Sequence, residues 1–92
     1  MSSVTLSSVP RFTRGYRLQH DTVRQQWIIQ APERALIADP IAAAILRHVD
    51  NTRSVDVIVD ELCQSFDASR ETITHDVLTL LSELVEKGIL RL

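Results

Sequence analysis

The sequence predicts an α+β fold with the element order of a winged helix-turn-helix domain, three short N-terminal β-strands followed by three α-helices. Two observations support this prediction. Apolar residues alternate with polar ones in the first part of the chain, whereas after Asp39-Pro40 they recur at three- and four-residue spacing, as on the buried face of a helix. A run of strands followed by a run of helices is typical of α+β domains in which the two kinds of element are segregated.

The first half contains the three expected strands. Residues 16–20 alternate between the two faces of a strand, residues 27–30 form a short run rich in β-branched and aromatic side chains, and residues 35–37 follow a turn that contains Pro32. Nothing after residue 37 has the pattern of a strand. We therefore expect the third strand at an edge of the sheet, where its free N–H and C=O groups are open to another chain.

The first helix is expected to begin at Asp39-Pro40, because Asp is a good N-cap and Pro is favoured at the first helical position. We expect it to end near residues 50–51, where Asn tolerates the left-handed conformation that closes a helix. The residues expected on its apolar face are Ile41, Ile45 and Val49.

Two further helices are expected in the second half. Ser54 is placed to cap one of them, and Ser69 is placed to cap the last, which should run to about Lys87 and stop at Gly88. The apolar pair at residues 89–90 is expected to pack back onto the core. The chain is thus interpreted as a flexible N-terminal arm over residues 1–15 and a single domain over residues 16–92.

Composition and charge limit the functional classes. The chain of 92 residues has 45% hydrophobic and 24% charged residues, as in ordinary globular proteins, and its net charge is −2. That charge is divided unevenly, with +3 over residues 1–38 and −5 over residues 39–92. The opening residues do not resemble a signal peptide, and no apolar run approaches the roughly 20 residues that cross a bilayer. We therefore expect a cytoplasmic protein that does not contact a membrane.

Catalytic chemistry is not expected. The three histidines fall in different predicted elements and lack the paired spacing of a metal-binding helix. Cys63 has the helical position of a buried core thiol, and two glycines cannot supply a phosphate-binding loop. We expect no catalytic residue, no metal and no cofactor.

DNA binding is the alternative function, because two helices separated by a short break at residues 67–69 resemble a helix-turn-helix. A recognition helix should offer cations and amides to phosphates and bases. The last helix instead opens with Arg70 among Glu71 and Asp76, on the acidic half of the chain. The electrostatics argue against a nucleic-acid partner, although a winged-helix transcriptional regulator stays as the alternative.

The last helix has a broad apolar arc, which can be interpreted in two ways. It is either the central helix of a small core, or it also forms one wall of a groove beside the third strand. In the second case, a peptide would add as a strand to the sheet edge and press alternate side chains onto the helix, a mode of recognition known as β-augmentation.

In this context the chain resembles the PqqD family over about residues 10–92. No single motif carries the resemblance, which rests on the order and spacing of several. They are Arg17-Leu18…Asp21, Pro32-Glu33-Arg34, Ala42-Ala43-Ala44-Ile45-Leu46…Asp50, Val55…Ile58-Val59…Leu62 and Asp76-Val77…Leu80-Leu81…Leu84…Gly88-Ile89-Leu90. Two departures are conservative: Asp50-Asn51 stands where the family usually has Asp-Gly, and Asp39 where it usually has Asn.

The resemblance implies a non-catalytic peptide chaperone of pyrroloquinoline quinone biosynthesis. Such a protein binds the ribosomal precursor peptide PqqA and presents it to the radical S-adenosylmethionine enzyme PqqE. In proteins of this fold, which serve as recognition elements for such peptides, the leader segment of the precursor peptide lies beside the third strand and on the third helix. Carried over to this chain, the implied peptide-binding residues are Arg34, Ala35, Leu36, Ile37, Ile73, Asp76, Val77 and Leu80.

Within that site, the backbone of Leu36 and Ile37 is expected to pair with the peptide, and Val77 and Leu80 to supply apolar contact. Arg34 is placed to attract an acidic peptide, whereas Asp76 either orients the peptide or is an ordinary solvated acid. We expect Asp at position 37 or 77 to abolish binding with the fold retained. The exposed edge also permits a homodimer by strand pairing or exchange, and the sequence does not decide between monomer and dimer.

Overall fold

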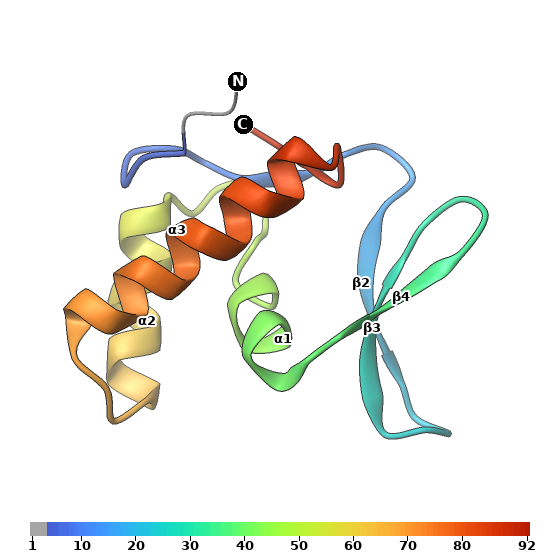
Figure 1. The fold of residues 1–92 in the computed structure, drawn as a ribbon, viewed down its shortest axis with the longest axis horizontal. Helices are drawn as coiled ribbons and strands as arrows, with labels where there is room; N and C mark the ends of the chain where they lie inside the picture. Colours follow the sequence, from blue (N-terminus) through green and yellow to red (C-terminus); the bar gives the residue numbers. More distant parts are fainter. Residues whose placement is uncertain (1–3) are drawn as a thin grey trace.

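The structure, a computed structural model, describes residues 4–92 and confirms the α+β fold class (Figure 1). Its helices are α1 (Pro40–Leu46), α2 (Val55–Ser65) and α3 (Arg70–Glu86). Its strands are β1 (Arg11–Phe12), β2 (Arg17–Asp21), β3 (Gln26–Gln30), β4 (Ala35–Ala38) and β5 (Leu90–Arg91). The three expected strands correspond to β2, β3 and β4, and the other two were not predicted.

The larger sheet is antiparallel, with the strand order β2-β3-β4. It stands on one side of the molecule, and the helices lie on the other (Figure 1). Its inner face packs on the hydrophobic core through alternate residues, which include Leu18, Ile29 and Leu36 in one cross-strand row. As expected, β4 lies at an edge of this sheet.

The second sheet is a ribbon of two strands in which β1 pairs antiparallel with β5. It corrects the expectation that the first 15 residues form an arm separate from the domain. Pro10 is fully buried, and the carbonyl groups of Leu6 and Ser8 accept hydrogen bonds from the first turn of α2. Residues 4–15 therefore pack on the domain, while residues 1–3 lie outside the described part of the chain.

All three helix starts have the expected caps. The side-chain oxygens of Asp39, Ser54 and Ser69 each accept the backbone N–H three residues further on, at 2.8, 3.3 and 3.1 Å. Pro40 occupies the first turn of α1 as expected. The last helix ends before Gly88, whose φ of +77° lies in the left-handed region that glycine adopts without strain.

The first helix is shorter than expected, since it ends at Leu46 rather than near residues 50–51. After it, the N–H groups of His48 and Val49 bond to carbonyl groups three residues earlier, so the chain tightens into turns and leaves the helical path. Val49 is consequently only half-buried, and Ile41 is 66% exposed. The apolar face expected for this helix is thus wrong at both of its ends. Of the three residues predicted for that face, only Ile45 is buried.

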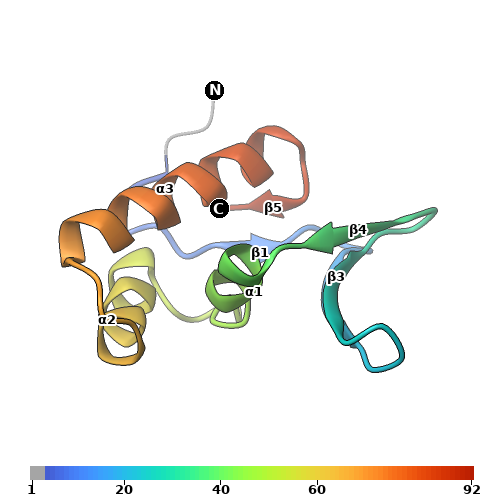
Figure 2. The same ribbon diagram turned by 60° about the horizontal axis from the view of Figure 1, so that its bottom comes forward.

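The core lies among the three helices and is closed by the C-terminal residues. Figure 2 shows α3 lying over α1 and α2, with the sheet to one side. Most of the fully buried side chains come from the three helices, and Ile89 and Leu90 pack on them as expected, at 2% and 1% exposure. No helix within residues 4–92 is long and apolar enough to cross a membrane.

Candidate binding groove

The β3–β4 hairpin determines which way the backbone groups of β4 point. The N–H of Ala31 donates to the carbonyl oxygen of Arg34 at 2.9 Å, next to the first cross-strand pair of the hairpin. Residue pairs in an antiparallel ladder alternate between those that exchange hydrogen bonds and those that do not. The Leu36 pair is therefore hydrogen-bonded, and the N–H and C=O groups of Leu36 and Ala38 face β3.

The outer edge of β4, meaning the side that faces away from β3, consequently carries the N–H and C=O groups of Ala35 and Ile37. This corrects the expectation for Leu36, because its backbone groups face β3 and are not available to a peptide at the outer edge. The side chain of Ile37 is 73% exposed, which is unusual for an isoleucine in a strand. The edge thus combines free backbone groups with exposed apolar surface.

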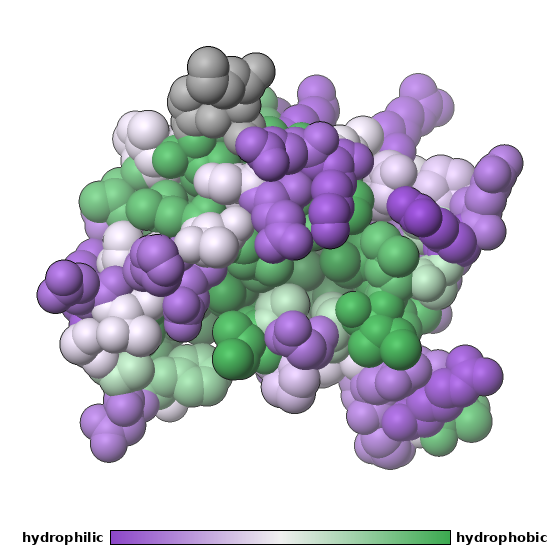
Figure 3. Space-filling view, in the orientation of Figure 1, coloured by the Kyte–Doolittle hydropathy of each residue, from purple (hydrophilic) through white to green (hydrophobic). Residues whose placement is uncertain are grey.

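A groove runs between β4 and the C-terminal half of α3, with a volume of about 660 Å³. Arg34, Leu36 and Ile37 line its strand side, and Leu80 lines its helix side. In the space-filling view, apolar surface extends below the charged side chains of α3 and is recessed at its centre (Figure 3). We call this space the β4 groove.

The remaining predicted site residues on α3 lie away from the β4 groove. Ile73, Asp76 and Val77 line a second pocket nearer the start of α3, so the structure divides the predicted site between two spaces. Val77 is fully buried and Ile73 is 8% exposed. An Asp at position 77 would place a carboxylate in the core, so the expectation that this substitution leaves the fold intact is wrong.

Several residues of the β4 groove were not predicted from the sequence. Glu83 and Lys87 follow Leu80 and Leu84 at helical spacing on the same side of α3, and that periodicity was a usable signal. Asp39 and Ala42 line the groove because α1 starts directly after β4. Their position depends on how the chain turns, which has no signature in local sequence.

The start of α3 is held by ion pairs to α2. Arg70 contacts the carboxylates of Asp56, at 3.0 Å, and Asp60. The hydrogen bond to Asp60 raises the pKa of Arg70 above its ordinary value. The cation at the start of α3 is therefore already neutralised by two acids, which argues against its use on a DNA phosphate.

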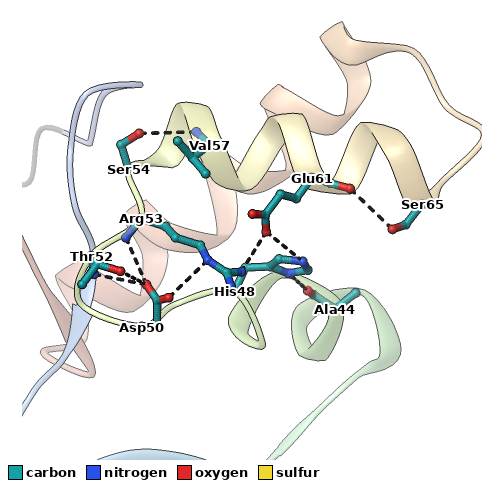
Figure 4. Close-up of polar contacts among 9 residues, drawn as sticks. All are labelled: Ala44, His48, Asp50, Thr52, Arg53, Ser54, Val57, Glu61 and Ser65. Carbon is teal, nitrogen blue, oxygen red and sulfur yellow. Dashed lines mark hydrogen bonds and ion pairs between the residues drawn. The ribbon is translucent and has the colours of Figure 1, made fainter.

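A polar network fixes the loop between α1 and α2 (Figure 4). The Asp50 carboxylate accepts the N–H groups of Thr52 and Arg53, and the Arg53 guanidinium reaches both Asp50, at 3.2 Å, and Glu61, at 2.8 Å. Asn51 has a φ of +70°, so the turn in which Asn replaces the family's glycine keeps its left-handed residue as expected. This network positions α1, and with it one end of the β4 groove.

Comparison with known proteins agrees with this architecture. Residues 26–90 match the family model described as coenzyme PQQ synthesis protein D (PqqD). A PqqA binding protein of Gluconobacter oxydans is 52% identical over 87 residues, which cover 95% of this chain and 91% of the relative. A PqqA binding protein of Xanthomonas oryzae pv. oryzae is 45% identical over the full length of both chains.

Two solved structures share the fold. The PqqD part of Methylobacterium extorquens PqqCD, described as a functional, stand-alone recognition element for ribosomally synthesised and modified peptides, superposes with a TM-score of 0.82 at 38% identity, covering 98% of this chain and 96% of that one. PqqD from Xanthomonas campestris gives 0.60 at 39% identity, covering 98% and 100%. Fold, family match and sequence identity agree, and the chain belongs to the PqqD family.

Proposed function

We propose that this protein binds the precursor peptide PqqA by adding a peptide strand to the outer edge of β4, and that it presents the bound peptide to the radical S-adenosylmethionine enzyme PqqE. One observation carries the proposal. The outward N–H and C=O groups of Ala35 and Ile37 lie beside the β4 groove, whose other wall is α3 and whose lining includes several apolar side chains. Relatives that share about half of the sequence are named for binding PqqA.

Strand addition would use both components of this edge. Backbone hydrogen bonds to Ala35 and Ile37 would supply affinity that does not depend on the peptide's sequence, while alternate peptide side chains would enter the β4 groove. Each added bond contributes roughly 0.5–1.5 kcal/mol net, against an ordering cost of roughly 2–5 kcal/mol for the peptide. With apolar contact from Leu80 and Leu36, we expect a dissociation constant on the order of 0.1–10 µM.

The proposed role is to hold the peptide, in the cytoplasm where it is made, while the partner enzyme performs the chemistry. Within residues 4–92, no group of three or more His, Cys, Asp or Glu side chains is placed to hold a metal. The acidic residues of α2 are a weak candidate surface for PqqE, because Asp56 and Asp60 pair with Arg70, and Glu61 pairs with Arg53.

The test is a titration of the protein with synthetic PqqA, followed by the fluorescence of Trp27, which pairs with Ala38 of β4. Wild-type protein should show saturable micromolar binding, and Ile37→Asp should abolish it. Val23→Asp is the matched control, because Val23 is 90% exposed in the distant β2–β3 turn. Equal affinities of the two variants would contradict binding at β4.

A random DNA duplex titrated in parallel at physiological salt examines the winged-helix alternative, and we expect no binding. A second copy of the chain pairing through β4 would compete with the peptide for the same edge. Sedimentation with and without PqqA measures this competition: any dimer formed through β4 should dissociate as peptide is added. The presentation step is tested by adding PqqE, which should bind the protein–peptide complex without releasing the peptide.

A further inference from the structure

A second apolar pocket lies at the opposite end of α3 from the β4 groove. Its volume is about 190 Å³, and it is formed where α1, the end of α2 and the start of α3 meet. Its lining includes the large apolar side chains of Ile41, Leu62, Phe66 and Ile73. We call it the α1–α3 pocket.

The size and lining of this pocket suit one large apolar side chain. A dry cavity of about 150 Å³ lined by aliphatic and aromatic residues is sufficient to bind benzene. Here the side chains at the mouth are exposed to solvent, with Ile41 at 66% and Phe66 at 50%. Two large apolar residues left open beside an apolar hollow are a feature of binding surfaces rather than of a finished core.

A shallow channel connects the α1–α3 pocket to the β4 groove. Ile41 and Asp76 line both the pocket and the channel. Asp39, Leu80 and Glu83 line both the channel and the β4 groove. The three spaces therefore form one continuous track along α3, past the point where β4 turns into α1.

The charges along this track change along its length. The β4 groove is lined by both signs of charge, with the cations of Arg34 and Lys87 beside the carboxylates of Asp39 and Glu83. The channel is lined by the carboxylates of Asp39, Asp76 and Glu83. Beyond them the lining of the pocket is almost entirely apolar, so a ligand that follows the track meets mixed charge first, then acidic surface and then apolar surface.

We propose that the peptide bound at β4 continues along this channel and anchors one aromatic or branched aliphatic side chain in the α1–α3 pocket. This inference rests on the proposed function and deepens it. The carboxylates of the channel further assign a basic peptide residue to that stretch, between the segment paired with β4 and the anchor.

The length of the track sets the spacing of the peptide's residues. Lys87 lines the β4 groove at the end of α3, and Ile73 lines the α1–α3 pocket near its start. At 1.5 Å per residue, these two residues lie about 21 Å apart along the helix axis. An extended peptide rises about 3.3 Å per residue. The pocket thus adds a contact for a residue several positions outside the segment that pairs with Ala35 and Ile37, and a peptide restricted to the paired segment cannot reach it.

The test is an isothermal titration of full-length precursor peptide into three variants of the intact protein. Phe66→Ser removes a pocket wall, and Ala68→Phe fills the pocket from the exposed loop before α3. Val57→Ser is the control, since Val57 is a 41% exposed apolar residue of α2 that does not line the pocket. We expect both pocket variants to bind roughly tenfold more weakly than the control, each with an unchanged thermal melt.

A scan of the peptide's apolar residues to Ala completes the test. One such peptide should lose affinity for the wild-type protein, and it should bind the wild type and both pocket variants equally, because the anchor is then already absent. The proposal is overturned if Phe66→Ser and Ala68→Phe bind as tightly as the control while Ile37→Asp does not bind. Failure of the wild-type protein to bind any precursor peptide would instead contradict the proposed function itself.

Discussion

The β1–β5 ribbon and the β4 edge are both short pieces of antiparallel sheet, but they differ in how far their apolar side chains and backbone groups are exposed to solvent. In the ribbon, Leu90 is 1% exposed, and its neighbour Ile89 accepts a further backbone bond from Thr13. At β4 the corresponding apolar residue, Ile37, is 73% exposed, and the outward backbone groups face solvent. The comparison indicates that the ribbon contributes to stability, whereas the β4 edge leaves its apolar side chain and outward backbone groups in solvent, as the proposed strand addition requires.

The largest effect is expected from a charge placed inside the domain. Val77→Asp should unfold the protein, because an isolated carboxylate in a fully buried position costs several kcal/mol against a total stability of roughly 5–15 kcal/mol. Circular dichroism should show the loss of the cooperative melt. Thr79→Asp, on the exposed face of the same helix, should melt like the wild type. A folded Val77→Asp protein would contradict the assignment of this residue to the core.

The comparison itself is sharpened by truncating one apolar residue in each region. Leu90→Ala should lower the free energy of unfolding by roughly 2–5 kcal/mol, because it leaves a cavity in the core. Ile37→Ala should change it by less than about 0.5 kcal/mol, since its side chain is already exposed. Urea denaturation measures both values. Similar losses in the two variants would remove the distinction between the ribbon and the edge.

A proline at the outer edge separates backbone pairing from side-chain contact. Ala35→Pro removes an N–H group that points away from β3, so the sheet should keep its internal ladder and its stability. Peptide affinity should fall about tenfold or more, because a hydrogen bond is lost and the pyrrolidine ring obstructs the incoming strand. Ala35→Ser keeps the N–H and should bind normally. Peptide titration of both variants decides whether the edge is used.

The smallest effect concerns the loop that positions α1. Hydrogen bonds from the N–H groups of Arg53 and Thr52 hold the pKa of Asp50 below its ordinary value of about 3.8. A depressed folded-state pKa stabilises the protein above the unfolded-state pKa, and this contribution is lost as the pH falls through the folded-state value. Thermal melts of the wild type and Asp50→Asn should therefore differ near neutral pH and converge in acid. A difference that is independent of pH would show that ionisation of Asp50 does not matter.

Much of the fold was predictable from short-range patterns. The starts of the three helices could be predicted from their N-cap residues Asp39, Ser54 and Ser69, because capping is a local interaction within three residues. The ribbon was not predictable, because strands of two residues are too short to show alternation and its pairing joins opposite ends of the chain. The exposure of Ile41 was also missed, since helical periodicity says which residues share a face but not whether another element covers it.

The site was only partly predictable for a related reason. The family resemblance implied Ile37 and Leu80 as site residues, and both line the β4 groove. The direction in which the β4 backbone groups point could not be predicted. It depends on the single hydrogen bond between Ala31 and Arg34 that determines which cross-strand pairs are hydrogen-bonded. The channel and the α1–α3 pocket depend on how α1 crosses α3, which only the assembled fold determines.

Amide hydrogen exchange tests the central claim most directly, because it reads individual backbone N–H groups of β4. In the free protein, the amides of Ala35 and Ile37 should exchange rapidly, and those of Leu36 and Ala38, which face β3, should be protected. Saturating PqqA should protect Ala35 and Ile37 and leave the other two unchanged. Exchange at Ala35 and Ile37 that stays rapid in the peptide complex would contradict strand addition at the outer edge of β4.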